Sequence, residues 1–213
     1  YLVERRRVVT HLGKLDLAKQ ALEEAEDVDS QHPYVINRWA DWFNKHPGKA
    51  NQEMALSLFV KYRKSGGPLY PCWFNDFGIV LQNLGRYSEC EAKYKEVIAL
   101  DSTKASSWNN LGGMYSLTRR YTEAEQVINK SMALDSTYAY AWNNLGDLYY
   151  QTGHYTEAEP VLRKAIALDS TLAVAWCNLG NLYNKTGRYA EAELVIKKAI
   201  ALDSINVTAW NNL

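Results

Sequence analysis

Asparagine pairs recur along the chain at regular intervals, as Asn109 with Asn110, Asn143 with Asn144 and Asn211 with Asn212. Each pair follows a tryptophan, and where a further pair would fall the sequence has Cys177 and Asn178. A side-chain carboxamide offers N–H donors and a carbonyl acceptor, which are the groups that an extended peptide backbone requires whatever its sequence. Since one such bond contributes only about 0.5–1.5 kcal/mol, a binding site made of carboxamides needs several of them.

The elements that carry these asparagines are expected to be helical hairpins. Trp108, Trp142, Trp176 and Trp210 lie 34 residues apart, and leucine, glycine, tyrosine and alanine positions follow the same period. Within one period, Trp142, Leu145 and Tyr149 have the i, i+3, i+7 spacing of a helix, Gly153 breaks the pattern, and a second apolar helical run begins at Ala158. Each 34-residue unit is therefore predicted to be a pair of helices.

The second helix of each unit has recognisable boundary signals. Ser88, Thr122 and Thr156 each precede a glutamate by three residues, the pattern of a capping box. Glycine stands three residues before this capping position at Gly85, Gly153 and Gly187, the last of which precedes Ala190, and a left-handed residue often ends a helix there. Arg119 replaces that glycine in one unit. We therefore expect the turn at Arg119 either to be strained or to use a different geometry.

A helical wheel separates two faces of the first helix. Tyr140, Asn143, Asn144, Asp147, Tyr150 and Gln151 fall on one face, and Trp142, Leu145 and Tyr149 fall on the opposite, core-facing side. Stacked hairpins would align the asparagines into two ladders, one of them interrupted by Cys177. The candidate peptide-binding residues are Asn75, Asn109, Asn110, Tyr140, Asn143, Asn144, Asp147, Tyr150, Gln151, Asn178, Asn181, Asn184 and Lys185.

Simpler interpretations stay open for these residues. Asn110, Asn144 and Asn178 could instead hold adjacent hairpins in register, and the variable side chains could be ordinary solvated surface. The tryptophans and the series Tyr87, Tyr121, Tyr155 and Tyr189 match the apolar stripe, so we expect them to pack in the core rather than to stack on a base or cofactor.

The motifs "W-x-N-L-G-x-x-Y", "Y-x-E-A-E" and "A-I-A-L-D" over residues 71–206 closely resemble the tetratricopeptide repeat family. The resemblance implies an all-α, right-handed superhelical solenoid of antiparallel helix pairs that holds a peptide or protein partner in its concave groove. In some members asparagines at such positions grip the main chain of the peptide. Members that clamp acidic chaperone tails use Lys and Arg on this face, which are missing here. The family's proline is replaced by Ser102, Ser136, Ser170 and Ser204, which we expect to cap the following helix.

The whole chain is expected to be one solenoid domain. Residues 1–32 are interpreted as a first hairpin truncated at its start, 33–70 as a divergent longer hairpin, 71–206 as four regular hairpins and 207–213 as the start of another. A linker between two packed halves is the alternative for residues 33–70. Because the chain stops within its own pattern, it looks like a piece of a longer protein, and uncovered terminal helices could support self-association.

Composition argues against other functions. The 24 basic and 24 acidic residues balance, so nucleic acid and anionic membranes are not expected partners. The three cysteines have no C-x-x-C spacing, which favours a reducing, cytoplasmic setting over a disulfide framework. The four histidines are scattered, so the sequence indicates no metal site, no cofactor and no catalytic nucleophile. We expect a non-enzymatic interaction scaffold; the alternative is the substrate-recruiting or sensor arm of a larger enzyme, such as a glycosyltransferase or signalling ATPase.

Overall fold

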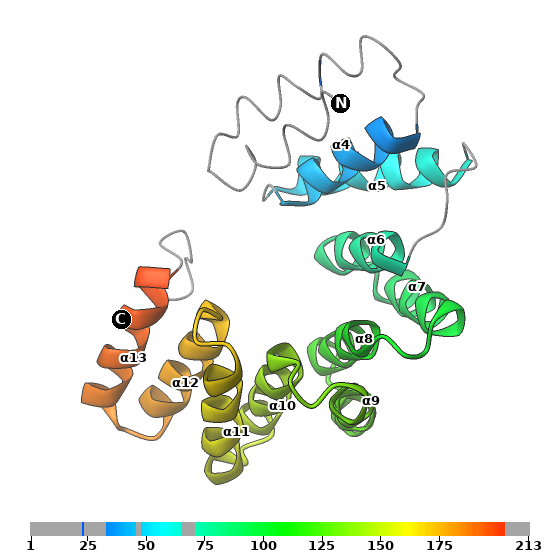
Figure 1. Ribbon diagram of the computed structural model, residues 1–213. Coiled ribbons are helices and arrows are strands. Elements are labelled where there is room, and N and C mark those ends of the chain that lie inside the picture. Colours follow the sequence, from blue (N-terminus) through cyan, green and yellow to red (C-terminus); the bar gives the residue numbers. More distant parts are fainter. Residues whose placement is uncertain (1–22, 24–32, 46–47, 65–70, 203–213) are drawn as a thin grey trace. The chain divides into compact units, whose positions relative to one another are not determined.

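The computed structural model describes residue 23 and residues 33–45, 48–64 and 71–202. In these ranges the regular structure is entirely α-helical, which confirms the predicted fold class (Figure 1). The chain separates into two compact units, Tyr1–Val97 and Ile98–Leu213. The hairpin expected over 1–32, apart from Glu23, and the hairpin start expected over 207–213 lie outside the described residues.

The first unit contains helices with an aromatic core. These are α4 (Pro33–Lys45), α5 (Lys49–Lys64), α6 (Pro71–Asn83) and α7 (Tyr87–Leu100), the last of which runs past the limit of the unit. Helices α4 and α5 pack together and both contact α6. Phe59 of α5 meets Trp73 edge-on at 5.7 Å between ring centroids and stacks on Phe77 at 5.4 Å. Burial of these rings provides the apolar surface that holds the unit together.

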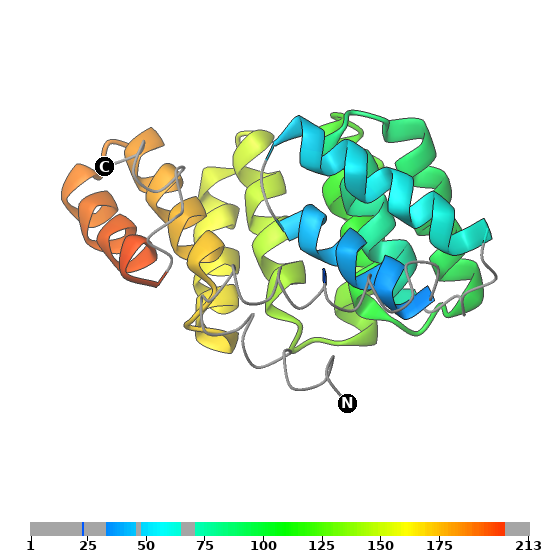
Figure 2. The ribbon, with the colours of Figure 1, turned by 90° about the horizontal axis from the view of Figure 1, so that it is seen from above.

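The second unit repeats a helical hairpin three times. Its helices are α8 (Ala105–Leu117), α9 (Tyr121–Leu134), α10 (Ala139–Gln151), α11 (Tyr155–Leu168), α12 (Ala173–Lys185) and α13 (Tyr189–Leu202). We call α8, α10 and α12 the first helices and α9, α11 and α13 the second helices. Helix α10 contacts α8, α9, α11 and α12, so the hairpins stack in chain order (Figures 1 and 2).

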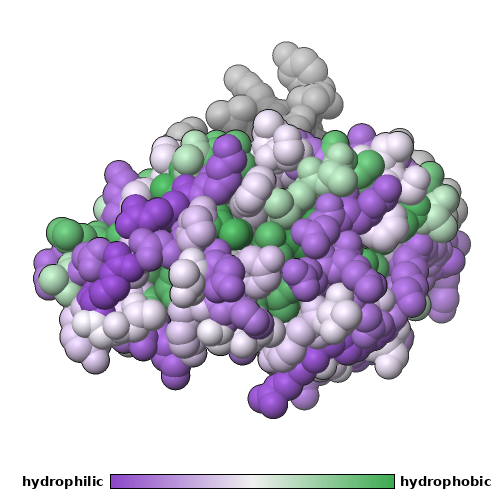
Figure 3. Space-filling model, turned by 90° about the horizontal axis from the view of Figure 1, so that it is seen from below, coloured by the Kyte–Doolittle hydropathy of each residue, from purple (hydrophilic) through white to green (hydrophobic). Residues whose placement is uncertain are grey.

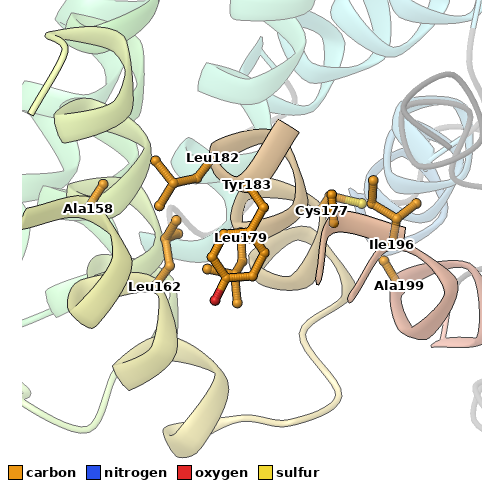
Figure 4. Packing of buried hydrophobic residues seen from close by; sticks show 9 residues of the cluster. Ala158, Leu162, Cys177, Leu179, Leu182, Tyr183, Ile196 and Ala199 are labelled. Atoms are coloured by element: carbon orange, nitrogen blue, oxygen red, sulfur yellow. The ribbon is translucent and has the colours of Figure 1, made fainter. Parts of the chain in front are cut away.

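Glycine in each first helix allows the two helices of a hairpin to approach closely. A methyl group at Gly146 would lie 2.6 Å from Cγ of Leu162, and one at Gly180 would lie 2.4 Å from Cγ1 of Ile196. Leu162 and Ile196 are buried in a cluster formed by α11, α12 and α13 together with Leu182 (Figure 4). Glycine therefore recurs in the motif because any side chain there would collide with the core of its own hairpin.

The repeat aromatics are less buried than the apolar stripe predicts. Trp142 is only half-buried, packing against Ala139, Ala165, Leu172 and Ala175, and Trp108 and Trp176 are half-buried too. Tyr87 and Tyr189 are 38% and 71% exposed, so the expectation that the whole tyrosine series packs in the core is wrong at these two positions. An amphipathic ring at a hairpin edge can keep its polar end in water.

The tryptophans also organise the loops between hairpins. Trp142 Nε1 donates to the carbonyl oxygen of Ser136 at 2.9 Å, while Asp135 Oδ1 accepts bonds from the backbone N–H and hydroxyl of Thr137. The same contacts recur in the loops before α8 and α12. The serines therefore act through their carbonyl groups, and the expectation that Ser102, Ser136 and Ser170 cap the next helix is wrong: the N-caps are Lys104, Tyr138 and Leu172.

The expectation that each second helix begins with a capping box is also wrong. Helices α9 and α11 begin at tyrosine and their N-caps are Arg120 and His154, so Thr122 and Thr156 already lie inside the first turn. In α9, the capping residue Arg120 pairs instead with Glu123 three residues later. The glutamate places its charge near the positive end of the helix dipole, which is favourable.

The turn within each hairpin requires a left-handed residue. Gly153 has φ of 83°; its N–H bonds to the carbonyl of Tyr150, and that of His154 bonds to Tyr149. Arg119 occupies the same place with φ of 61° and makes the equivalent bonds. The predicted strain at Arg119 is confirmed, since a side chain with a Cβ adopts this conformation at a cost that glycine avoids.

Arg119→Gly is expected to stabilise the protein. Relief of the left-handed strain, offset by the greater freedom of glycine in the unfolded chain, should raise the free energy of unfolding by about 0.5–1 kcal/mol. Urea denaturation followed by circular dichroism measures the change. Gly153→Ala, the reverse change at the equivalent position, should lower stability by about 1 kcal/mol. A destabilised Arg119→Gly protein would contradict this account.

Candidate peptide-binding face

Side-chain amides link the first helices of the second unit. Asn144 Nδ2 donates to Asn109 Oδ1 at 2.9 Å, and Asn178 Nδ2 donates to Asn143 Oδ1 at 3.0 Å. Asn143 Nδ2 in turn donates to Asn144 Oδ1 at 3.3 Å. These bonds form one continuous amide chain from Asn178 on α12, through both residues of α10, to Asn109 on α8.

The two members of an asparagine pair differ in exposure. Asn109 and Asn143 are each 3% exposed, so their amides serve the contact between hairpins. Asn144 and Asn178 are half-buried, and each amide has two N–H groups of which one is used. Among the described residues the Oδ1 atom of Asn178 receives no hydrogen bond, because Cys177 stands where a second amide would be. Asn144 and Asn178 therefore retain hydrogen-bonding capacity on this face.

Helix α10 contributes four further candidates, namely Tyr140, Asp147, Tyr150 and Gln151. Gln151 Nε2 donates to Asp147 Oδ2 at 2.6 Å, and burial raises the pKa of Asp147 above its usual range although that hydrogen bond opposes the rise. Tyr140 is 46% exposed and its ring lies 5.6 Å from that of Tyr138. Tyr150 is half-buried against Tyr155 of α11, with 5.9 Å between ring centroids.

The other candidates are distributed as follows. Asn110 is half-buried on α8, Asn181 and Asn184 are half-buried on α12, and Lys185 is exposed at the end of α12. Asn75 lies on α6 in the first unit. The structure therefore places twelve of the thirteen candidates on the first helices of the second unit, and Asn75 belongs to the first unit.

Charge is segregated between the two kinds of helix. Across α8, α10 and α12 the charged side chains are Asp147 and Lys185 alone. The second helices α9, α11 and α13 carry acidic and basic residues throughout. Hydrophilic residues also predominate over the face of the molecule in Figure 3, where hydrophobic areas are small and scattered. The first helices carry a polar stripe that includes Tyr140, Asn144, Asp147, Gln151 and Asn178. We call this stripe the amide face.

An ion-pair network lies between the last two hairpins, and the sequence analysis missed it. Glu159 of α11 accepts hydrogen bonds from Arg188 at 2.6 Å, from Arg163 at 2.9 Å and from the hydroxyl of Tyr183 at 2.9 Å. Arg188 also pairs with Glu191. The bonds from Arg188, followed by those from Tyr183 and Arg163, hold the pKa of Glu159 at about 2. The available signal was a recurrence, since arginine returns with the repeat period at Arg86, Arg120 and Arg188, with His154 as the exception.

Other kinds of site find no support among the residues that the structure describes. None of their helices is both long and apolar enough to cross a membrane. They contain no group of three or more His, Cys, Asp or Glu residues placed to hold a metal ion. Cys90 and Cys177 are buried thiols outside any disulfide.

Comparison with known proteins identifies the class. Two family models, each described as a tetratricopeptide repeat, match residues 103–171 and 143–207. Residues 103–207 therefore form tetratricopeptide repeats, as the sequence motifs predicted. Repeats of this family form scaffolds for protein–protein interaction. No curated protein sequence matches the chain significantly.

Solved structures agree with the fold. A chain of the APC/C hetero-tetramer Cut9–Hcn1 superimposes with a TM-score of 0.71 at 16% identity, over 95% of this chain and 39% of that one. A thermophilic TPR protein from Thermus thermophilus, TTC0263, gives 0.68 at 22% identity over 76% and 88%. MamA gives 0.54 at 23% identity over 73% and 91%. This chain thus spans well under half of the matched chain of Cut9–Hcn1. At these low sequence identities, the similarity shows a shared fold and nothing more.

Proposed function

We propose that this protein is a non-catalytic scaffold whose amide face binds an extended peptide segment of a partner protein. The observation that carries the proposal is the residual hydrogen-bonding capacity of Asn144 and Asn178 on adjacent first helices. Each presents an unused N–H group, and a peptide backbone supplies carbonyl groups at regular intervals to accept such donors.

The amide chain favours binding by holding these donors in place beforehand. Asn109 and Asn143 fix Asn144 and Asn178 through hydrogen bonds, so their side chains lose less conformational freedom when a ligand binds. The same interactions hold neighbouring hairpins in register. Register and ligand binding are therefore two uses of one set of amides, divided between the buried and the half-buried member of each pair.

The charge pattern narrows the class of ligand. An acidic tail would find only Lys185 as a cation on the first helices. Nucleic acid binding depends on many phosphate contacts from Lys and Arg, which this face lacks. A peptide held chiefly through its main chain is the ligand that suits a neutral row of amides.

A randomised peptide library tests the proposal. Twelve-residue peptides displayed on phage would be selected on the purified chain, and the affinities of enriched peptides measured by fluorescence polarisation. Asn144→Ala and Asn178→Ala should each weaken binding about three- to tenfold, as expected for the loss of one hydrogen bond. Asn129→Ala, which removes an exposed asparagine from second helix α9, is the matched control and should bind as the unsubstituted chain does.

Two results would reject the proposal. One is that the chain enriches no peptide above background. The other is that Asn144→Ala and Asn178→Ala bind enriched peptides unchanged while thermal unfolding shows that both remain folded. Because Asn144 also links α10 to α8 and Asn178 also links α12 to α10, weaker binding reports lost ligand contact only in a variant whose unfolding is native.

A further inference from the structure

Asp147 is an isolated anion on the amide face. It is the acidic residue of the first helices, while the equivalent positions on the neighbouring helices are Gly113 and Asn181. Ion pairs elsewhere in the second unit engage acidic residues of the second helices, such as Glu123, Glu159 and Glu191. No Lys, Arg or His among the described residues pairs with Asp147.

The surroundings of Asp147 suit a cation. Gln151 bonds to Oδ2, whereas Oδ1 receives no hydrogen bond from any described residue. Burial raises the pKa of this carboxyl, which means that the ionised form is poorly solvated where it stands. A cation placed against it would compensate that lost solvation.

Aromatic rings lie on the same helix. Tyr150 follows Asp147 by three residues, about 4.5 Å along the helix axis, and Tyr140 precedes it by two turns. Tyrosine rings attract ammonium and guanidinium groups over their faces, and arginine also stacks on them. A carboxylate with a tyrosine one turn away is a combination that favours a basic side chain over a neutral one.

We infer that the segment bound by the amide face carries a lysine or arginine side chain that pairs with Asp147. This inference rests on the proposed function and adds the chemistry of the partner: a segment held by its main chain along the asparagines, with one basic side chain selected at α10. Gly113, which lacks a side chain and lies beside Asn144, leaves room next to α10 for such a residue.

The same displayed library tests the inference. Peptides enriched by the unsubstituted chain should contain Lys or Arg at one aligned position. Asp147→Asn, which keeps the size of the side chain and a polar partner for Gln151, should bind those peptides about tenfold more weakly. When the library is selected on Asp147→Lys, the preference at that position should change to Asp or Glu. Glu157→Gln removes an equal charge from an exposed position on second helix α11 and should change neither affinity nor preference.

The outcomes separate the two proposals. If the unsubstituted chain enriches peptides without a basic position, or if Asp147→Asn binds them equally well, the inference about Asp147 is overturned and the scaffold proposal stands. If the unsubstituted chain enriches no peptide, both are overturned. Asp147→Asn is expected to unfold at the same temperature as the unsubstituted chain or a higher one, because burial disfavours the ionised carboxylate, so weaker binding would report the lost charge.

Discussion

Leu162→Ala is expected to lower the free energy of unfolding by about 2–5 kcal/mol, the range found for removal of a fully buried leucine side chain. Leu162 is completely buried on α11 and lies between Gly146 of its own hairpin and the cluster formed with α12 and α13. Removing its side chain leaves a cavity at the contact between two hairpins. Urea denaturation measures the loss, and Leu194→Ala, at a 70% exposed leucine on α13, should cost far less.

A second substitution makes this prediction sharper. Gly146→Ala alone should destabilise the protein, because the new methyl group would lie 2.6 Å from Leu162 Cγ and 2.7 Å from Cδ2. In the Leu162→Ala background those atoms are absent, so the same change should instead stabilise by about 0.5–1 kcal/mol through the better helix propensity of alanine. Identical effects in the two backgrounds would contradict the packing described for this hairpin.

Glu159→Gln is expected to lower the free energy of unfolding at pH 7 by about 1–3 kcal/mol, since the partly exposed carboxylate is bonded by two arginines and a tyrosine. The pKa of Glu159 is lowered in the folded protein from its usual value near 4.5 to about 2. A lowered carboxyl pKa contributes stability that is complete above the unfolded value. That contribution disappears as the pH falls from about 4.5 to about 2.

Stability measured against pH checks the origin of this effect. The difference between the unsubstituted chain and Glu159→Gln should shrink across that acidic interval and be absent below it. Glu157→Gln, on the same helix but exposed, is the control and should leave stability almost unchanged. A difference between Glu159→Gln and the unsubstituted chain that persists undiminished to the lowest pH would show that packing, rather than charge, is responsible.

The hairpins could be predicted from the sequence because the signals for them are local. The 34-residue period, the apolar spacing of Trp142 and Leu145 and the breaker Gly153 all act within one unit, and the structure follows them. The strain at Arg119 could be predicted for the same reason: three of four equivalent positions are glycine, and the turn geometry does not change at the fourth.

Details that depend on one residue of register, or on how hairpins meet, could not be predicted. The second helices begin one residue before the hydroxyl, so Thr122 is not a cap and Arg120 takes that position. The helical wheel placed Asn143 and Asn144 on one face. A wheel describes a single helix, so it cannot predict the offset between neighbouring first helices. That offset brings Asn144 to Asn109 and leaves Asn143 buried, and it also brings Arg188 to Glu159.

The thiol of Cys177 gives the repeat array a polarity. One hairpin earlier, Asn143 donates to the carbonyl oxygen of the asparagine beside it; at α12 the corresponding position holds a buried cysteine. Among the described residues, the chain of carboxamide hydrogen bonds therefore starts at Asn178. Hairpins that look interchangeable in sequence are therefore inequivalent, because within the described amide chain only Asn178 has an Oδ1 atom that accepts no hydrogen bond.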